Sequence, residues 1–191
     1  AQENAAAAEP LFRRALTIRE RKLGREDLVV AITLNNLGMV QQTLGEYAEA
    51  EALLKRALSI REKKNDPMVA ESITNLALLF LETGAKNYGY SESLFRRALT
   101  IAKKRGREHP SVGAALNNLG TAIYIQGRYS EAETVWNETL KLREKVLGRE
   151  HLTVAETVNN LAVLYRKTGR YAKAEEFNDR VLAIRKKTLG M

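Results

Sequence analysis

The chain has 191 residues, of which 45% are hydrophobic and 28% charged, a composition that is ordinary for a folded protein and unlike that of a disordered one. It contains no cysteine, which excludes disulfides and thiol chemistry, and no apolar run approaches the roughly 20 residues that a bilayer-spanning helix needs. The formal net charge of +8 is compatible with an acidic protein partner or a nucleic acid, so the placement of the charges has to decide between them.

The expected elements are all helices. Twelve glycines and three prolines leave few turns, and apolar residues recur at helical rather than alternating spacing. A helix over about residues 5–22 comes first, as the second helix of an incomplete leading repeat, 5–24. Four helix pairs follow, in the ranges 27–64, 67–105, 110–147 and 152–189. Pro10 fits only the first turns of the leading helix, because proline lacks the N–H that a helix interior uses.

The same short sequences recur along the chain at a nearly constant interval. The leucines of RALTI, RALSI, RALTI, ETLKL and RVLAI are Leu16, Leu58, Leu99, Leu140 and Leu182. A single globular core would not impose such a period, whereas stacked helix pairs that bury their apolar faces against one another do. Each pair turns at a Gly-x-Tyr sequence such as Gly45-Glu46-Tyr47, where glycine can adopt the left-handed conformation of a helix cap.

Asparagines stand in the middle of the first helix of each pair. Leu34-Asn35-Asn36-Leu37-Gly38 recurs in full at 116–120 and, with small changes, at 73–77 and 158–162. An asparagine costs about 0.6 kcal/mol relative to alanine in a helix, so this repetition needs a compensating role. Because a helix turns about 100° per residue, the first asparagine is expected on the concave side of a stacked array and the second nearer the neighbouring helix.

These residues carry a resemblance to a known family. The strings ALTIRERKLGRED, LNNLG and LGEYAEAEALLKRAL resemble the tetratricopeptide repeat, and specifically the long repeats of the kinesin light chain group. A HEAT or armadillo array has a similar period, but the Gly-x-Tyr turn followed by alanine favours the tetratricopeptide repeat. The resemblance covers almost all of residues 5–189. It implies an all-α, right-handed superhelical solenoid of antiparallel helix pairs.

The resemblance also implies a function and a set of site residues. In such repeats, groove asparagines bind the main chain of an extended peptide, because an amide offers both a donor and an acceptor. The expected peptide-binding groove consists of Asn35, Met39, Gln42, Thr74, Leu78, Asn117, Thr121, Tyr124, Asn159, Val163, Arg166 and Lys167. The expected inter-repeat amide ladder consists of Asn36, Asn75, Asn118 and Asn160. Exposed spacers remain the alternative for the first asparagines, and ligand contacts for the second.

The two ends of the sequence carry separate hints. Asn178 occupies the position of Phe12, Leu54, Phe95 and Trp136 in the earlier repeats. A following helix would be expected to cover that position, so a polar residue there favours an array that ends nearby with this helix as its cap. The opening AQENAAAAEP suits an exported protein whose signal has been removed and equally a cytoplasmic protein without its first residues. We favour the cytoplasm.

The placement of charge favours a protein partner over a nucleic acid. Most basic residues lie at helix ends, as in Arg61-Glu62-Lys63-Lys64, where they offset the negative end of the helix dipole. No aromatic residues interleave with them as stacking platforms. The sequence predicts no enzyme, cofactor or metal site, because it lacks cysteine and a phosphate loop. We therefore expect a scaffold that binds a protein or peptide, without membrane insertion. The alternative is a self-associating structural or regulatory sensor module of a larger chain.

Overall fold

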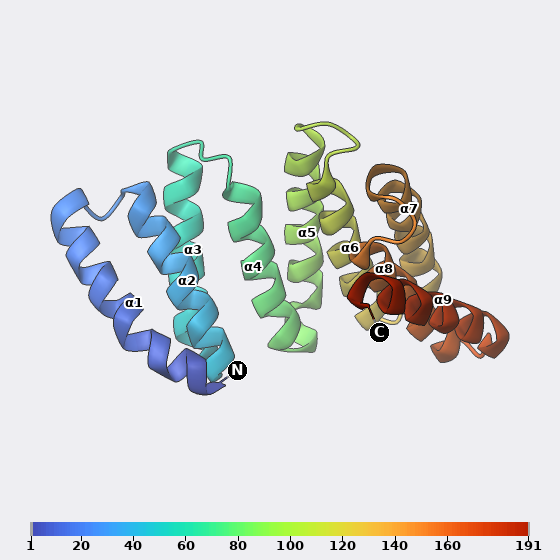
Figure 1. Cartoon of the computed structure of the whole chain (residues 1–191). Helices are drawn as coiled ribbons and strands as arrows, with labels where there is room; N and C mark the ends of the chain where they lie inside the picture. Colours follow the sequence, from blue (N-terminus) through green and yellow to red (C-terminus); the bar gives the residue numbers. More distant parts are fainter. Residues whose placement is uncertain (1, 191) are drawn as a thin grey trace. The chain divides into compact units, whose positions relative to one another are not determined.

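The computed structural model describes residues 2–190, apart from the side chains of Ala85 and Leu189. The regular structure of these residues is helical (Figure 1). The helices are α1 (Gln2–Leu23), α2 (Leu28–Leu44), α3 (Tyr47–Lys63), α4 (Val69–Glu82), the short 3-10 helix η1 (Ala85–Asn87), α5 (Tyr88–Lys103), α6 (Pro110–Ile125), α7 (Tyr129–Leu147), α8 (Leu152–Lys167) and α9 (Tyr171–Leu189). Within those residues there is no strand, and the prediction of an all-α chain is confirmed. No helix among them is long and apolar enough to cross a membrane.

The helices pack into two compact units, which divide between Leu94 and Phe95 inside α5. In the first unit α2 packs against both α1 and α3, and α3 packs against α4 (Figure 1). In the second unit α6 packs against α7, α7 against α8, and α8 against α9. Each unit therefore repeats one arrangement, in which helices that follow one another in the sequence lie side by side.

Glycines and side-chain caps set the ends of the helices. Gly45 has φ 85°, and its N–H donates to the carbonyls of Gln41 and Gln42 at the end of α2. This left-handed cap is a conformation that other residues resist, and it lets Tyr47 begin α3 two residues later. At the starts of α6 and α8, His109 Nδ1 and His151 Nδ1 accept from the backbone N–H groups of Ser111 and Thr153. Both histidines of the chain are therefore helix caps.

Pro10 lies deeper in its helix than the sequence predicts. Helix α1 begins at Gln2, so Pro10 is in its third turn rather than in its first. Proline there removes one backbone hydrogen bond and crowds the carbonyl of Ala6. Its side chain is exposed, and α1 continues through it to Leu23. The prediction that Pro10 fits only the first turns of this helix was wrong.

In the two repeats that contain LNNLG, its glycine lets two helices approach closely. A Cβ added to Gly120 would lie 2.5 Å from Nε1 of Trp136 on α7, and one added to Gly38 would lie 2.8 Å from Cγ of Leu54 on α3. Leu54 on α3 therefore packs against α2, and Trp136 on α7 packs against α6, each within its own repeat. The side chain of Asn178, which holds the corresponding position on α9, is exposed.

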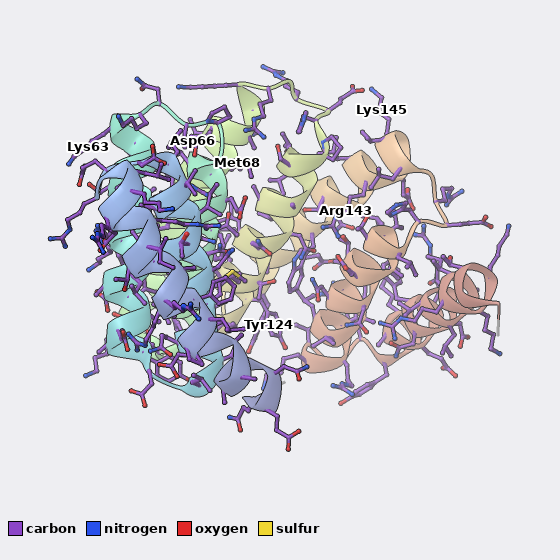
Figure 2. The ribbon with its side chains drawn as sticks, turned by 60° about the vertical axis from the view of Figure 1, so that its left-hand side comes forward. Lys63, Asp66, Met68, Tyr124, Arg143 and Lys145 are labelled. Atoms are coloured by element: carbon purple, nitrogen blue, oxygen red, sulfur yellow. The ribbon has the colours of Figure 1, made fainter. Side chains whose placement is uncertain are left out.

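Three arginines at the ends of second helices cross to the next helix instead of facing water. Arg19 Nη1 donates to Thr33 Oγ1 at 2.6 Å. Arg61 Nη1 donates to Ser72 Oγ and to the carbonyl of Met68, both at 3.0 Å. The exposed fractions of Arg61 and Arg143 are 3% and 7%, so these two helix-end cations are buried and do more than offset the helix dipole, the role that the sequence predicts for basic residues there. Figure 2 labels Arg143 on α7 and Met68 ahead of α4.

Exposed ion pairs join successive repeats in a regular series. Lys63 pairs with Glu26 at 2.8 Å, Lys145 with Glu108, and Lys187 with Glu150 at 2.6 Å. In each case a lysine near the end of a second helix reaches the Gly-Arg-Glu loop of the preceding repeat. Single exposed pairs of this kind stabilise a fold little. Their recurrence shows, however, that much of the basic charge is paired within the chain.

Candidate ligand-binding faces

In the first unit, α2 and α4 present a common outward face. The residues that recur at helical spacing on it, which we call the α2–α4 face, are Ile32, Asn36, Met39, Thr43, Glu71, Asn75, Leu78 and Glu82. Three large apolar side chains are exposed here: Ile32 is 44% exposed, Met39 46% and Leu78 38%. Neighbouring exposed apolar groups mark surfaces that can be covered by a ligand.

Amide hydrogen bonds tie the two helices together beneath this face. Asn75 Nδ2 on α4 donates to Asn35 Oδ1 on α2 at 3.1 Å and lies 3.6 Å from the sulfur of Met39. Closer to the C-terminal ends of the same helices, Gln42 Nε2 donates to Glu82 Oε2 at 2.9 Å. The junction of the two helices is therefore polar and hydrogen-bonded, and the exposed side chains beside it are apolar at Ile32, Met39 and Leu78 and polar at Thr43, Glu71 and Glu82.

The second unit repeats the arrangement between α6 and α8. The corresponding residues, which we call the α6–α8 face, are Ala114, Asn118, Thr121, Ile125, Glu156, Asn160, Val163 and Lys167. Asn160 Nδ2 donates to Asn117 Oδ1 at 3.1 Å, as Asn75 does to Asn35. Thr157 Oγ1 lies 3.5 Å from the same oxygen of Asn117. In both units, therefore, the first asparagine of one repeat accepts a hydrogen bond from the second asparagine position of the next repeat.

The structure places the two asparagines of the motif differently from the sequence expectation. Asn35 was expected in an open groove, but it is 1% exposed, and Asn117 is half-buried. Both accept a hydrogen bond from the second asparagine of the following repeat. The reason is that α4, the first helix of the next repeat, packs over the stripe of α2 that holds Asn35 and Gln42. The solvent-facing stripe of α2 is therefore the neighbouring one, which holds Asn36. Asn36 and Asn118, expected in the junction, instead belong to the outward faces.

The other expected groove residues have varied environments. Thr74 is half-buried and its hydroxyl donates to the carbonyl of Ala70. Tyr124 is half-buried, with its ring 5.5 Å from that of Trp136 (Figure 2). Asn159 and Val163 are half-buried on α8, and Arg166 and Lys167 are exposed on its last turn. Thr121 donates to the carbonyl of Asn117.

The first helices carry very little charge. Helices α2 and α6 contain no charged residue, α4 contains only Glu71 and Glu82, and α8 contains Glu156, Arg166 and Lys167. The whole chain has 31 lysines and arginines and 23 aspartates and glutamates, so nearly all of the charge lies on the second helices and the loops. A ligand on the first helices would meet amides, hydroxyls and apolar groups, together with these five charged side chains.

The sequence reasoning missed the junction arginines. Arg143 Nη1 donates to the carbonyl of Thr153, to Thr157 Oγ1 at 2.9 Å and to Glu156 Oε2 at 3.3 Å. Burial lowers the pKa of this guanidinium, while Glu156 opposes the shift. The available signal was the recurrence of arginine three residues after the repeated leucine, as in Leu58 and Arg61. That spacing alone does not distinguish a buried arginine from a solvated one.

The family comparison agrees with this geometry. The family model described as tetratricopeptide repeat matches residues 1–63 and 111–187. No curated protein matches the chain. Many solved structures do, however, and the three that follow illustrate their range.

The chain is similar to the nearly identical TPR-like repeats of a kinesin light chain from Podosopora anserina, with 24% identity and a TM-score of 0.82 over 100% of this chain and 92% of that one. It is similar to BtubC (BKLC) from P. vanneervenii, with 24% identity and a TM-score of 0.81 over 98% and 76%. A Rap protein complexed with Competence and Sporulation Factor has 21% identity and a TM-score of 0.78 over 96% of this chain and 50% of that one. These likenesses confirm the predicted solenoid of antiparallel helix pairs.

Proposed function

The chain belongs to the tetratricopeptide repeat family, and we propose that it is a protein-interaction scaffold whose α2–α4 and α6–α8 faces bind an extended peptide or a partner helix. The observation that carries the proposal is the exposed surface of the first helices, on which apolar side chains lie beside amides and a few charged groups. Ile32, Met39 and Leu78 are each more than a third exposed there, beside the asparagines of the same helices. Apolar side chains with a few fixed polar groups are typical of a binding surface.

The mechanism is preorganisation by the packed helices. Asn75 directs its amide nitrogen toward Asn35 and Met39, which fixes the side chain and leaves its carbonyl oxygen for a ligand N–H. Asn160 is held in the same way by Asn117. A ligand then meets amides whose orientation has already been set, so most of the conformational entropy lost on binding is its own.

This proposal changes the roles of the expected site residues. The second asparagines Asn36, Asn75, Asn118 and Asn160 would contact the ligand, and Asn35 and Asn117 would hold Asn75 and Asn160 from beneath. Met39, Leu78, Thr121 and Val163 would receive its side chains. Arg166 and Lys167 would take an acidic residue or a terminal carboxylate. The Rap protein complexed with Competence and Sporulation Factor, of which this chain matches half the length, supports ligand capture as a role open to this fold.

Selection from a random peptide library, followed by affinity measurement, tests the proposal. The double variant Asn36→Ala and Asn118→Ala should weaken binding of the selected peptides roughly tenfold, since it removes two amide contacts. Asn4→Ala, an exposed asparagine on α1, is the matched control and should leave the affinity unchanged. Equal affinity of the double variant and the control would contradict the proposal.

The salt dependence of the same binding separates a peptide from a nucleic acid. Contacts to amides and apolar groups should change the affinity less than about threefold between 50 and 500 mM salt, whereas phosphate contacts would lower it steeply, by orders of magnitude. A steep loss would show that the basic second helices, and not the proposed faces, hold the ligand.

A further inference from the structure

Two carboxylates at opposite ends of the α2–α4 face have no cationic partner. Glu71 lies in the first turn of α4 and Glu82 is its last residue, and both side chains are exposed. Glu82 accepts a hydrogen bond from the neutral amide of Gln42, and within residues 2–190 neither glutamate forms an ion pair. Because no lysine or arginine of the described chain pairs with these carboxylates, both are available to a cation from a ligand.

The arginine that could pair with Glu71 is used elsewhere. In the second unit, Arg143 pairs with Glu156 at 3.3 Å, and Glu156 holds the position of Glu71 in the repeat. In the first unit, the equivalent Arg61 lies 3.4 Å from Asp66 instead. The carboxylate of Glu71 can therefore serve an external partner, whereas that of Glu156 already has a guanidinium beside it.

The other end of the face differs in sign between the two units. Lys167 on α8 holds the position that Glu82 holds on α4, and both side chains are exposed. The α2–α4 face therefore carries two negative charges and no positive one, whereas the α6–α8 face carries a paired glutamate and a lysine. Charge complementarity then requires a cation at each end of a ligand on the α2–α4 face.

The spacing of the two carboxylates matches an α-helix better than an extended chain. Glu71 and Glu82 are eleven residues apart on α4, which is about 16 Å along the helix axis. In a second helix, residues eleven positions apart also lie on one face. In an extended chain about five residues cover this distance, and the side chains at the two ends of such a segment point to opposite faces. Exposed Leu78 on α4 and Met39 on α2 lie between the two ends of the face, where the middle of a ligand helix would cover them.

We propose, on the basis of the proposed function, that the α2–α4 face binds a basic amphipathic α-helix of a partner protein. Its contacting face carries a lysine or arginine at each end, eleven residues apart, and apolar residues between them. The two cations pair with Glu71 and Glu82, and the apolar residues cover Met39 and Leu78. The net charge of +8 repels such a helix from the basic second helices and loops, so its binding depends on the two glutamates.

A fluorescent, alanine-rich helical peptide tests the site through a double-mutant cycle. The peptide carries two lysines eleven residues apart, with leucines at the fourth and seventh positions after the first lysine. Its anisotropy reports binding to the full 191-residue protein at about 50 mM salt, where exposed ion pairs are screened little. Glutamine in place of both lysines should weaken binding to the wild type roughly fivefold, and Glu71→Gln with Glu82→Gln should weaken binding of the lysine peptide equally. The variant protein should bind the two peptides alike, because either change removes the same ion pairs.

Two controls accompany this cycle. Glu175→Gln with Glu176→Gln removes the same charge from exposed positions on α9 and should leave the affinity for the lysine peptide within about twofold. A lysine peptide with proline in place of one alanine between the lysines cannot form the continuous helix and should lose its binding.

Any of three results would overturn the proposal: no saturable binding of the lysine peptide, equal binding of the lysine and glutamine peptides to the wild type, or equal effects of the two pairs of glutamate substitutions. Undiminished binding of the proline peptide would assign the face to an extended ligand instead. Self-association in sedimentation experiments that Glu71→Gln with Glu82→Gln abolishes would assign it to a second copy.

The library peptides judge the proposed function separately from this inference. If the lysine peptide fails while Asn36→Ala with Asn118→Ala still weakens the library peptides, the faces bind ligands and only the basic helix is the wrong ligand. If that asparagine variant has no effect on the library peptides, the proposed function itself fails.

Discussion

At the scale of single residues, the asparagines of the repeated motif explain why the chain tolerates poor helix formers in mid-helix. The first asparagine accepts a hydrogen bond across a helix junction, as Asn35 does from Asn75. The second asparagine of the following repeat is the donor. A buried amide with its partner in place contributes about 1 kcal/mol, which exceeds the intrinsic helix penalty of about 0.6 kcal/mol. Alanine would forgo the link between repeats.

The two asparagines of one motif should respond in opposite ways to replacement. Asn35→Ala removes an acceptor that is 1% exposed and leaves Asn75 unpaired, so it should destabilise the protein by about 1 kcal/mol after the gain in helix propensity. Asn36→Ala removes a half-buried side chain and should stabilise it by a few tenths of a kcal/mol. Urea unfolding measures both. A larger loss of stability for Asn36→Ala than for Asn35→Ala would show that Asn36, and not Asn35, links the repeats, and would contradict this assignment.

Gly120→Ala should be among the costliest single-methyl changes in the chain. Its Cβ would lie 2.5 Å from the Trp136 ring, whose Nε1 donates to the carbonyl of Asn117 at 3.1 Å, so the ring would have to move. Overpacking of this kind costs about 1–3 kcal/mol. Gly89→Ala is the matched control: nothing lies within 4 Å of the added group, and thermal unfolding should show a slight stabilisation. Similar melting temperatures for the two variants would contradict the close approach of α6 and α7.

Sequence reasoning identified the right residue types at this scale and expected Asn75 and Asn160 at the junction between repeats, where they donate hydrogen bonds, but it expected their acceptors Asn35 and Asn117 in an open groove. The helical period predicts that two adjacent asparagines lie about 100° apart. It does not say which of the two asparagines faces the first helix of the next repeat. That depends on how side chains such as Gln42 and Glu82 fit across the junction of the two helices. The repeated motif could therefore be recognised from the sequence. Which of its asparagines lies in the junction (Asn35) and which on the solvent-facing side (Asn36) could be learned only from tertiary contacts.

At the scale of helices, buried arginines link second helices to their successors. Arg61 is 3% exposed and holds Ser72, Met68 and Asp66. Arginine at the end of a helix is also what a solvated, dipole-compensating residue looks like. Sequence spacing predicted the helices and their turns. Because buried and solvated arginines occur at the same helix positions, it could not tell which of the helix-end cations are buried.

Replacing Arg61 should destabilise the protein much more than breaking an exposed pair. Arg61→Ala leaves Asp66, whose side chain is 11% exposed, and the fully buried Ser72 without their partner, at a cost of about 3 kcal/mol. Lys55→Ala, which breaks the exposed pair with Glu51, should cost less than about 0.5 kcal/mol. Chemical unfolding compares the two variants. Equal costs would mean that the junction is not held through the arginine.

The pair formed by Glu133 and Arg170 should make stability depend on pH. Two hydrogen bonds from Arg170, at 2.9 and 2.8 Å, lower the pKa of the Glu133 carboxyl. A lowered pKa in the folded state means that the pair stabilises above the ordinary glutamate pKa of about 4.3 and stops doing so as the pH falls through the folded value. The melting temperature of Glu133→Gln should therefore lie below that of the wild type at pH 7, and the gap should close as the pH falls below the ordinary glutamate pKa and through the lowered folded value.

Glu175→Gln, on the exposed side of α9, provides the control for this titration. Its melting temperature should follow that of the wild type from about pH 7 to about pH 3. A gap for Glu133→Gln that stays constant or widens in acid would show that the substitution acts through packing and not through the ionised carboxyl.

At the scale of the whole molecule, charge is segregated between the two kinds of helix. The first helices contain five charged residues, namely Glu71, Glu82, Glu156, Arg166 and Lys167, although the chain carries a net charge of +8. The net charge is therefore a property of the second helices and loops, where much of it is paired. It makes a nucleic acid a poor candidate for the proposed faces.

Most of the architecture could be predicted from the sequence because repetition multiplies a weak local signal. The recurrence of the leucine of RALTI and of the Gly-x-Tyr turn identified the helix pairs, and the family model matches them over residues 1–63 and 111–187. Ligand identity is different, because no part of the repeat encodes it. The faces differ from one another at Ile32, Glu71, Ala114 and Glu156, which share one position in the repeat, and such variation tells only where selectivity would arise.

Fluorescence from a single engineered cysteine tests most directly the claim that the first helices bind the ligand. The chain has no cysteine of its own, so an environment-sensitive dye can be attached at Thr43→Cys on the α2–α4 face and, separately, at Ser59→Cys on α3, both exposed positions. A selected peptide should change the emission at position 43 with a midpoint equal to its dissociation constant and leave position 59 unaffected. A response at position 59 with none at position 43 would place the ligand on the second helices and contradict the account.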